Sequence, residues 1–198
     1  QGETKFWVSN LNREKKGLDL SPWLPPDFQL IDWDPKNPDY VYSLKNGILS
    51  GFNLRRGEVR SLEIAHGVKG FGVKHNRLYI LREDFSLIQT DRVGKNPEPL
   101  LEDAAAAQEI FGRARGAFYR IELFKRDFFQ KDLVLFLSDK GALLSSRLPY
   151  SIADGGVQHF QYATHSEEEK LLFWTAREIS AIDFTKEATE EIFEKGPR

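Results

Sequence analysis

The chain has 198 residues, with 28 Lys and Arg against 30 Asp and Glu, which gives a formal net charge of −2. Hydrophobic residues make up 40% and aromatic residues 13%, too many for a disordered chain and enough for one domain, or two small ones, with a packed core. Residues 1–99 hold 15 basic and 13 acidic side chains, so neither half is strongly basic. Nucleic acid and anionic membranes are therefore not expected as partners.

The chain contains no cysteine and no methionine. The lack of cysteine excludes disulfides, thiolate metal sites and cysteine nucleophiles. The lack of an initiator methionine favours a processed or excised chain, and we expect an extracytoplasmic location: secreted, periplasmic or anchored through a further segment. No run of residues approaches the roughly 18 apolar positions that a membrane-spanning helix needs, so no membrane insertion is expected within this chain.

Period-2 patterning dominates, which predicts short strands joined by tight turns. Residues 1–27 are expected to form a strand at 5–10 and a proline-rich connection at 20–27. Antiparallel meanders of short strands then follow one another along the chain. The first set of predicted strands comprises 28–33, 40–44, 48–54 and 59–64. The second set comprises 70–74, 78–81, 85–90 and 99–102.

Two further sets complete the pattern. The third set comprises 117–124, 133–138 and 142–148. The fourth comprises 157–163, 171–175 and 179–184, with a weak strand near 188–193. The second strands begin near residues 40, 77, 132 and 170, and the one long interval contains an alanine-rich stretch. That stretch predicts a short inserted helix near 103–112, with Asp103 as its N-cap and Gly112 as its end.

A repeat of about 40 residues with four short strands is typical of a β-propeller, in which neighbouring blades cover the faces of each sheet. We therefore predict an all-β, propeller-like array of about four four-stranded antiparallel blades, near 28–64, 69–102, 117–150 and 157–193. An ordinary β-sandwich or open barrel is the alternative. The blades could close into a four-bladed ring, or belong to a larger ring completed by more chain or by a second copy.

One segment resembles a known class of repeats. The stretch WDPKNPDYVYSLKNG at 33–47 is similar to blades of the TolB-like and Asp-box-bearing propellers, and GILSGFNLRRGE at 47–58 resembles the third strand and closing turn of such a blade. The phrase recurs at 169–184. The resemblance spans roughly residues 28–192 and implies the propeller fold. The full Asp-box pattern is absent, so no subfamily is assigned and no functional residue is carried over.

Two groups of residues resemble metal ligands. Asp32, Asp34, Asn37 and Asp39 bring oxygen atoms together as calcium loops do, but Pro35 and Pro38 interrupt the spacing and Asp or Asn beside Pro is also typical of a turn. We favour the turn and leave calcium open. His159 and His165 would share a strand face, yet no third ligand has a known position, and no metal or other cofactor is predicted.

No catalytic constellation emerges. There is no G-x-S-x-G, the glycines of HGVKGFGVK precede no helix, and pairs such as Glu83 and Asp84 fall at predicted turns. We therefore predict that the chain is not an enzyme. A hydrolase acting from a central pocket would need carboxylates that converge from different blades, which sequence alone does not place.

Most aromatic residues fall in strands, where they would pack between blades. Trp7, Trp23, Phe128 and Phe129 lie outside or at the edges of the repeats and are the candidate contacts for a partner, although burial is the favoured alternative for the two phenylalanines. The predicted function is a non-catalytic binding or scaffolding domain for a protein or peptide, with the contact made through loops at one face. A carbohydrate-binding propeller that uses Trp7 and Trp23 is the alternative, and a homodimer through blade edges is a further possibility.

Overall fold

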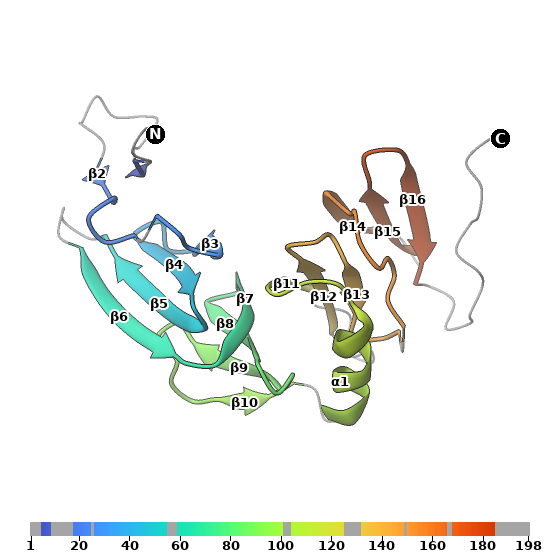
Figure 1. Cartoon of the computed structure of the whole chain (residues 1–198), viewed down its shortest axis with the longest axis horizontal. Helices are drawn as coiled ribbons and strands as arrows, with labels where there is room; N and C mark the ends of the chain where they lie inside the picture. Colours follow the sequence, from blue (N-terminus) through green and yellow to red (C-terminus); the bar gives the residue numbers. More distant parts are fainter. Residues whose placement is uncertain are drawn as a thin grey trace.

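A computed structural model describes residues 5–8, 18–24, 26–54, 59–100, 104–124, 132–148, 150–165 and 168–184. Over these residues the chain is mostly β, with one short helix, as the sequence predicts. The strands occur in four successive meanders along a curved array (Figure 1). Within the described residues, no helix is long and apolar enough to cross a membrane.

Meander 1 is a four-stranded antiparallel sheet in the order β3-β4-β5-β6. Its strands are β3 (Leu30–Trp33), β4 (Tyr40–Lys45), β5 (Ile48–Asn53) and β6 (Arg60–Ala65). The hairpin between β4 and β5 turns at Asn46 and Gly47, which both have positive φ, of 50° and 74°. An Asn-Gly pair favours this turn, because its backbone twist matches that of the flanking strands.

Meander 2 contains four strands and meander 3 contains three. Meander 2 has β7 (Val68–Lys74), β8 (Arg77–Arg82), β9 (Leu87–Asp91) and β10 (Glu98–Pro99). Meander 3 has β11 (Tyr119–Phe124), β12 (Leu133–Ser138) and β13 (Leu143–Ser145). The sequence predicts separate blades, but β7 and β11 pair in parallel, so these two meanders form one seven-stranded sheet.

Two glycines allow β7 and β11 to approach this closely. A Cβ on Gly70 would lie 2.3 Å from the carbonyl oxygen of Tyr119, and a Cβ on Gly72 would lie 1.8 Å from the carbonyl oxygen of Ile121. Neither space accepts a side chain without separation of the strands. At the GFG stretch (70–72), the backbones of β7 and β11 are therefore in direct contact.

Meander 4 is a three-stranded sheet of β14 (His159–His165), β15 (Glu168–Trp174) and β16 (Ile179–Asp183). The weak strand predicted near 188–193 lies outside the described residues. At the other end of the chain, β1 (Trp7–Val8) and β2 (Leu18–Asp19) form a small two-stranded sheet. Residues 5–8 and 18–24 together are called the N-terminal cap below.

The predicted helix is present as α1 (Ala104–Arg113). It runs one residue past Gly112, which was expected to end it, and Asp103 lies outside the described residues. Phe111 packs on the rings of Phe85, Tyr119 and Phe136, at centroid distances of 5.4, 5.2 and 4.9 Å. Phe85 was expected to start a strand, but it has a φ of 64° and belongs to the preceding turn.

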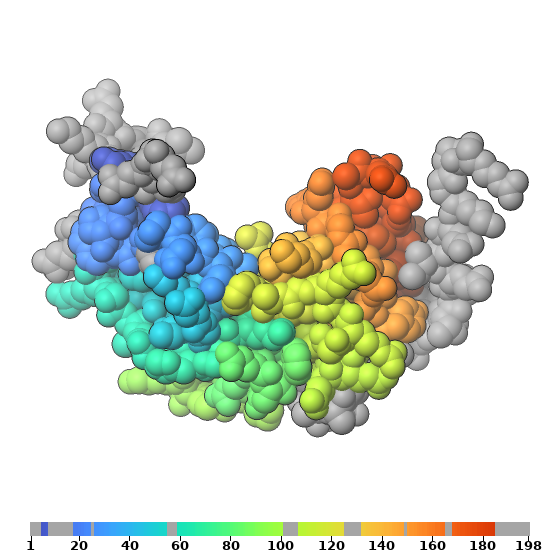
Figure 2. All heavy atoms as spheres, viewed as in Figure 1, coloured from blue at the N-terminus to red at the C-terminus, as the bar shows by residue number. Residues whose placement is uncertain are grey.

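Apolar cores lie between successive meanders. Tyr42 and Phe71 pack between meanders 1 and 2, and Ile121 packs with α1 between meanders 2 and 3. Leu135 and Phe173 pack between meanders 3 and 4. The first and last meanders lie at opposite ends of the array (Figure 1), and the surface is hollowed between them (Figure 2). Within the described residues the array is thus an open arc.

The two ends of this arc differ. The outer face of meander 1 is covered by the N-terminal cap, because Leu20 and Leu24 pack on Val41, Phe52 and Leu54. Among the described residues, no comparable apolar segment packs on the outer face of meander 4, where Ile179 on β16 is 65% exposed.

Candidate functional site

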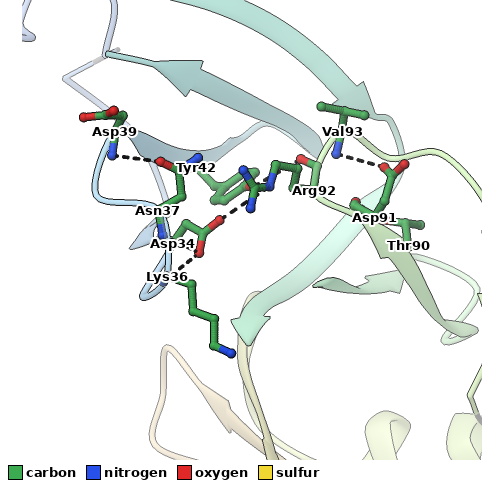
Figure 3. Close-up of polar contacts among 9 residues, drawn as sticks. All are labelled: Asp34, Lys36, Asn37, Asp39, Tyr42, Thr90, Asp91, Arg92 and Val93. Carbon is green, nitrogen blue, oxygen red and sulfur yellow. Dashed lines mark hydrogen bonds and ion pairs between the residues drawn. The ribbon is translucent and has the colours of Figure 1, made fainter. Parts of the chain in front are cut away.

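Three of the residues considered as calcium ligands, Asp34, Asn37 and Asp39, lie in the turn between β3 and β4 (Figure 3), and the fourth, Asp32, lies on β3. Asp34 is buried, and its Oδ1 accepts hydrogen bonds from the backbone N–H groups of Lys36 at 2.9 Å and Asn37 at 3.1 Å. Asn37 Oδ1 accepts from the N–H of Asp39 at 3.3 Å, and Asp32 Oδ1 accepts from the N–H of Trp33 at 2.8 Å. The side-chain oxygen atoms of Asp34 and Asn37 thus close the turn, as the proline-interrupted spacing favours.

The same turn joins meander 1 to meander 2. Asp34 Oδ2 is buried, accepts no hydrogen bond, and lies 3.9 Å from Nε of Arg92, in the loop that follows β9. Tyr42 donates a hydrogen bond from its hydroxyl to the carbonyl oxygen of Arg92 at 3.1 Å. Burial raises the pKa of Tyr42, and the nearby Asp34 raises it further, so the phenol stays protonated as a donor. We interpret this cluster as a structural link between the two meanders.

Hydrogen bonds to Asp91 close the loop that carries Arg92. Asp91 Oδ1 accepts hydrogen bonds from the backbone N–H groups of Val93 at 3.0 Å and Lys95 at 2.8 Å. Gly94, with a φ of 82°, completes the turn. Arg92 is therefore presented to Asp34 from a defined loop, and its side chain remains one-third exposed.

A second group of charged residues lies on the first strands of the four meanders. We call it the inner-strand cluster, and it comprises Asp32, Lys74, Arg120, Glu122 and His159. β3 lies beside β7, and β7 pairs with β11, which brings the first three strands together. His159, on β14, is close enough to Glu122 to lower the pKa of that carboxyl group.

Burial dominates the electrostatics of the inner-strand cluster. It raises the pKa of Glu122, an effect that Lys74 and Arg120 oppose. It likewise raises the pKa of Asp32, and it lowers the pKa of Lys74. Lys74 also places its ammonium 4.1 Å from the ring centre of Phe124, a favourable cation–π contact. Asp32, Lys74 and Glu122 therefore place charges of both signs on three neighbouring strands at partial burial, with the exposed Arg120 beside them.

The inner-strand cluster has only a weak signal in the sequence. Its signal is one or two charged residues in an otherwise apolar first strand, as in LIDW (30–33), GFGVK (70–74) and YRIELF (119–124). Each charge alone resembles an ordinary exposed strand position. Only the pairing of first strands shows that the charges share a surface.

His159 and His165 both lie on β14, and the side chain of His165 is outside the described part of the structure. Among the described residues, no three or more His, Asp or Glu side chains form a group that could hold a metal ion. The ring of His159 lies 5.2 Å from that of Trp174, in a tilted aromatic contact.

The candidate contact residues lie at one end of the molecule as far as the structure describes them. Trp7 and Trp23 both belong to the N-terminal cap, where they are 59% and 40% exposed. Backbone hydrogen bonds tie this segment together, from the N–H of Leu20 to the carbonyl of Phe6 at 2.7 Å and from the N–H of Trp23 to that of Leu20 at 3.0 Å. Phe128 and Phe129 lie outside the described residues.

Comparisons with known proteins give distant likenesses only. No protein-family model matches the chain, and no curated protein matches it, so the resemblance to TolB-like and Asp-box-bearing repeats receives no support. The crystal structure of the N-terminal domain of Nup159 is similar over 75% of this chain and 48% of that chain, with 11% identity and a TM-score of 0.40. A structure of S. cerevisiae Dbp5 bound to Nup159, Gle1, IP6 and ADP matches over the same shares, with 12% identity and a TM-score of 0.38. The chain spans about half the length of these solved chains, and we base no argument on them.

Proposed function

We propose that this chain is a non-catalytic binding module that presents a rigid surface to a protein or peptide partner. In this proposal its meanders are propeller-like blades, near 28–64, 69–102, 117–150 and 157–193, preceded by an N-terminal segment at 1–27. The observation that carries the proposal is the exposure of Trp7 and Trp23 on a cap that is anchored to meander 1.

The cap combines a buried anchor with an exposed aromatic surface. Leu20 and Leu24 are buried against meander 1, while Trp7 and Trp23, in the same short segment, face solvent. Large exposed tryptophans are costly in water and are enriched among the residues that dominate binding energy in protein interfaces. Because the cap is held by packing and by backbone hydrogen bonds, little conformational freedom would be lost when a partner binds.

The same exposure supports a second candidate function. Flat tryptophan rings can also stack on sugar rings, so a carbohydrate ligand would use Trp7 and Trp23 as well. A glycan-binding screen separates the two candidates. Glycan binding that is lost when both tryptophans become alanine would favour the carbohydrate module over the protein-binding module.

A quantitative affinity capture tests the protein-binding proposal. The bait proteins are the unchanged chain, the Trp7→Ala/Trp23→Ala variant, and Tyr150→Ala as a matched control, because Tyr150 is an exposed aromatic residue elsewhere, at 41% exposure. We expect a protein that the chain and the control retain, that the double variant loses by about tenfold or more, and that binds directly once purified. Equal retention by all three baits would contradict the proposal.

A further inference from the structure

Lys74, the last residue of β7, holds its amine against an aromatic ring. Its Nζ lies 4.1 Å from the ring centre of Phe124, the last residue of β11. The amines of Lys45 and Lys170, by contrast, pair with carboxylates at 2.7 and 2.5 Å. Among the described residues, no carboxylate forms an ion pair with Lys74. Within that part of the chain, an aromatic ring thus takes the place of a direct anionic partner.

The ring of Phe124 is held in place by contacts on two sides. It packs on the ring of Tyr162, on β14, at a centroid distance of 4.7 Å. The backbone of Phe124 pairs with that of Leu133 on β12, and β11 pairs in parallel with the strand that carries Lys74. The amine therefore lies beside a fixed apolar wall, while the side chain of Lys74 remains partly exposed.

This environment changes the protonation of the amine. Burial lowers the pKa of Lys74, because the ammonium form loses solvation, and Glu122 opposes this shift. The other charged residues on the neighbouring strands are Arg77, its register partner on β8, Asp32 on β3 and Arg120 on β11. At neutral pH a larger fraction of Lys74 is therefore unprotonated than of an ordinary lysine, and the unprotonated amine is the form that attacks carbonyl groups.

We propose that Lys74 is a covalent modification site for small aldehydes. The nitrogen lone pair adds to the carbonyl carbon, and the resulting carbinolamine loses water. One C=N bond and one water molecule thus replace the C=O bond and two N–H bonds, with no oxidant or reductant required. The aldehyde has to be small, because the amine is only partly exposed beside Phe124.

Reductive methylation measures the reactivity of each lysine. The probe is a limiting amount of isotopically labelled formaldehyde with sodium cyanoborohydride at pH 7, which converts each imine into a stable methylamine that peptide mass spectrometry assigns to a residue. Lys170 is the internal reference, because its hydrogen bond to Glu168 raises the pKa of its amine. We expect Lys74 to be methylated about threefold faster than Lys170 or more, and this difference to disappear when the chain is unfolded in urea.

Glu122→Gln tests whether the environment of Lys74 sets its reactivity. The glutamine removes the carboxylate that stabilises the ammonium form, so methylation of Lys74 should become about twofold faster or more, while that of Lys170 stays unchanged. Glu63→Gln is the matched control, because Glu63 is exposed on β6, and should change neither rate. Circular dichroism checks that both variants are folded.

Two results would overturn the proposal. The first is methylation of Lys74 no faster than that of Lys170 in the folded chain, whether the amine is shielded or fully protonated. The second is a rate at Lys74 that Glu122→Gln leaves unchanged, which would mean that the inner-strand cluster does not control this amine.

Discussion

Replacement of Gly72 by alanine tests the joint between meanders 2 and 3. The new Cβ would lie 1.8 Å from the carbonyl oxygen of Ile121, whereas carbon–oxygen contacts between strands are normally about 3.3–3.6 Å. The obstacle is backbone on both sides, so relief requires β7 and β11 to separate by more than about 1 Å. Such separation disrupts the pairing of Tyr119 with Gly70 and of Arg120 with Phe71.

The expected cost combines two terms. Overpacking in a well-packed region costs about 1–3 kcal/mol, and each weakened backbone hydrogen bond adds about 1 kcal/mol. We therefore expect Gly72→Ala to lower the free energy of unfolding by about 3 kcal/mol, measured by urea unfolding with tryptophan fluorescence. Gly112→Ala is the same chemical change in α1, with no atom within 4 Å of the new Cβ, and should leave stability unchanged or raise it by up to about 1 kcal/mol. A Gly72→Ala protein as stable as the unchanged chain would refute this account of the joint.

Three further predictions concern the sites described above. Burial raises the folded-state pKa of Glu122, so the stability linked to its protonation is present at low pH and is lost as the pH rises through the raised pKa. Glu122→Gln should therefore raise the thermal midpoint of unfolding at pH 7 and change it little at pH 4. Equal shifts of the midpoint at both pH values would argue against this. Asp34→Ala should cost about 2 kcal/mol in urea unfolding, because two backbone N–H groups lose their acceptor, whereas Asp34→Asn keeps an acceptor and should cost less. Phe111→Ala should cost about 3–5 kcal/mol in the same assay, because it empties the centre of an aromatic cluster; a loss below 1 kcal/mol would mean that α1 contributes little to the core.

The strands could be predicted from the sequence because their signals are local. The alternation of Tyr40, Tyr42 and Leu44 with less apolar or smaller neighbours, followed by the Asn46–Gly47 turn, contains the information that forms the hairpin of β4 and β5. The inserted helix was predicted for the same reason, from an alanine-rich run between two strand sets. The sequence pattern misplaces Phe85 because bulky residues seldom adopt positive φ, whereas in the structure its N–H closes a turn on Arg82 and its ring packs on Phe111.

The arrangement of the meanders could not be predicted in this way. The parallel pairing of β7 with β11 depends on Gly70 and Gly72, whose meaning depends on a partner strand about 50 residues away. The inner-strand cluster likewise depends on contacts between distant parts of the chain, because Asp32 and Glu122 come from different meanders. The turn at Asp34 is ambiguous in sequence between a calcium loop and an ordinary turn, since either use needs the same oxygen atoms, and the structure adds the backbone hydrogen bonds that Asp34 accepts.

Site-specific photo-cross-linking tests the central claim, that the N-terminal cap is the contact surface for a protein partner. The photoreactive residue p-benzoylphenylalanine replaces Trp7 in one protein and Tyr150 in a control, and both are irradiated in extract from the source cells. Our account predicts a discrete protein adduct at position 7, absent at position 150 and lost when Trp23→Ala is added. No adduct at position 7, or the same adducts at both positions, would contradict it.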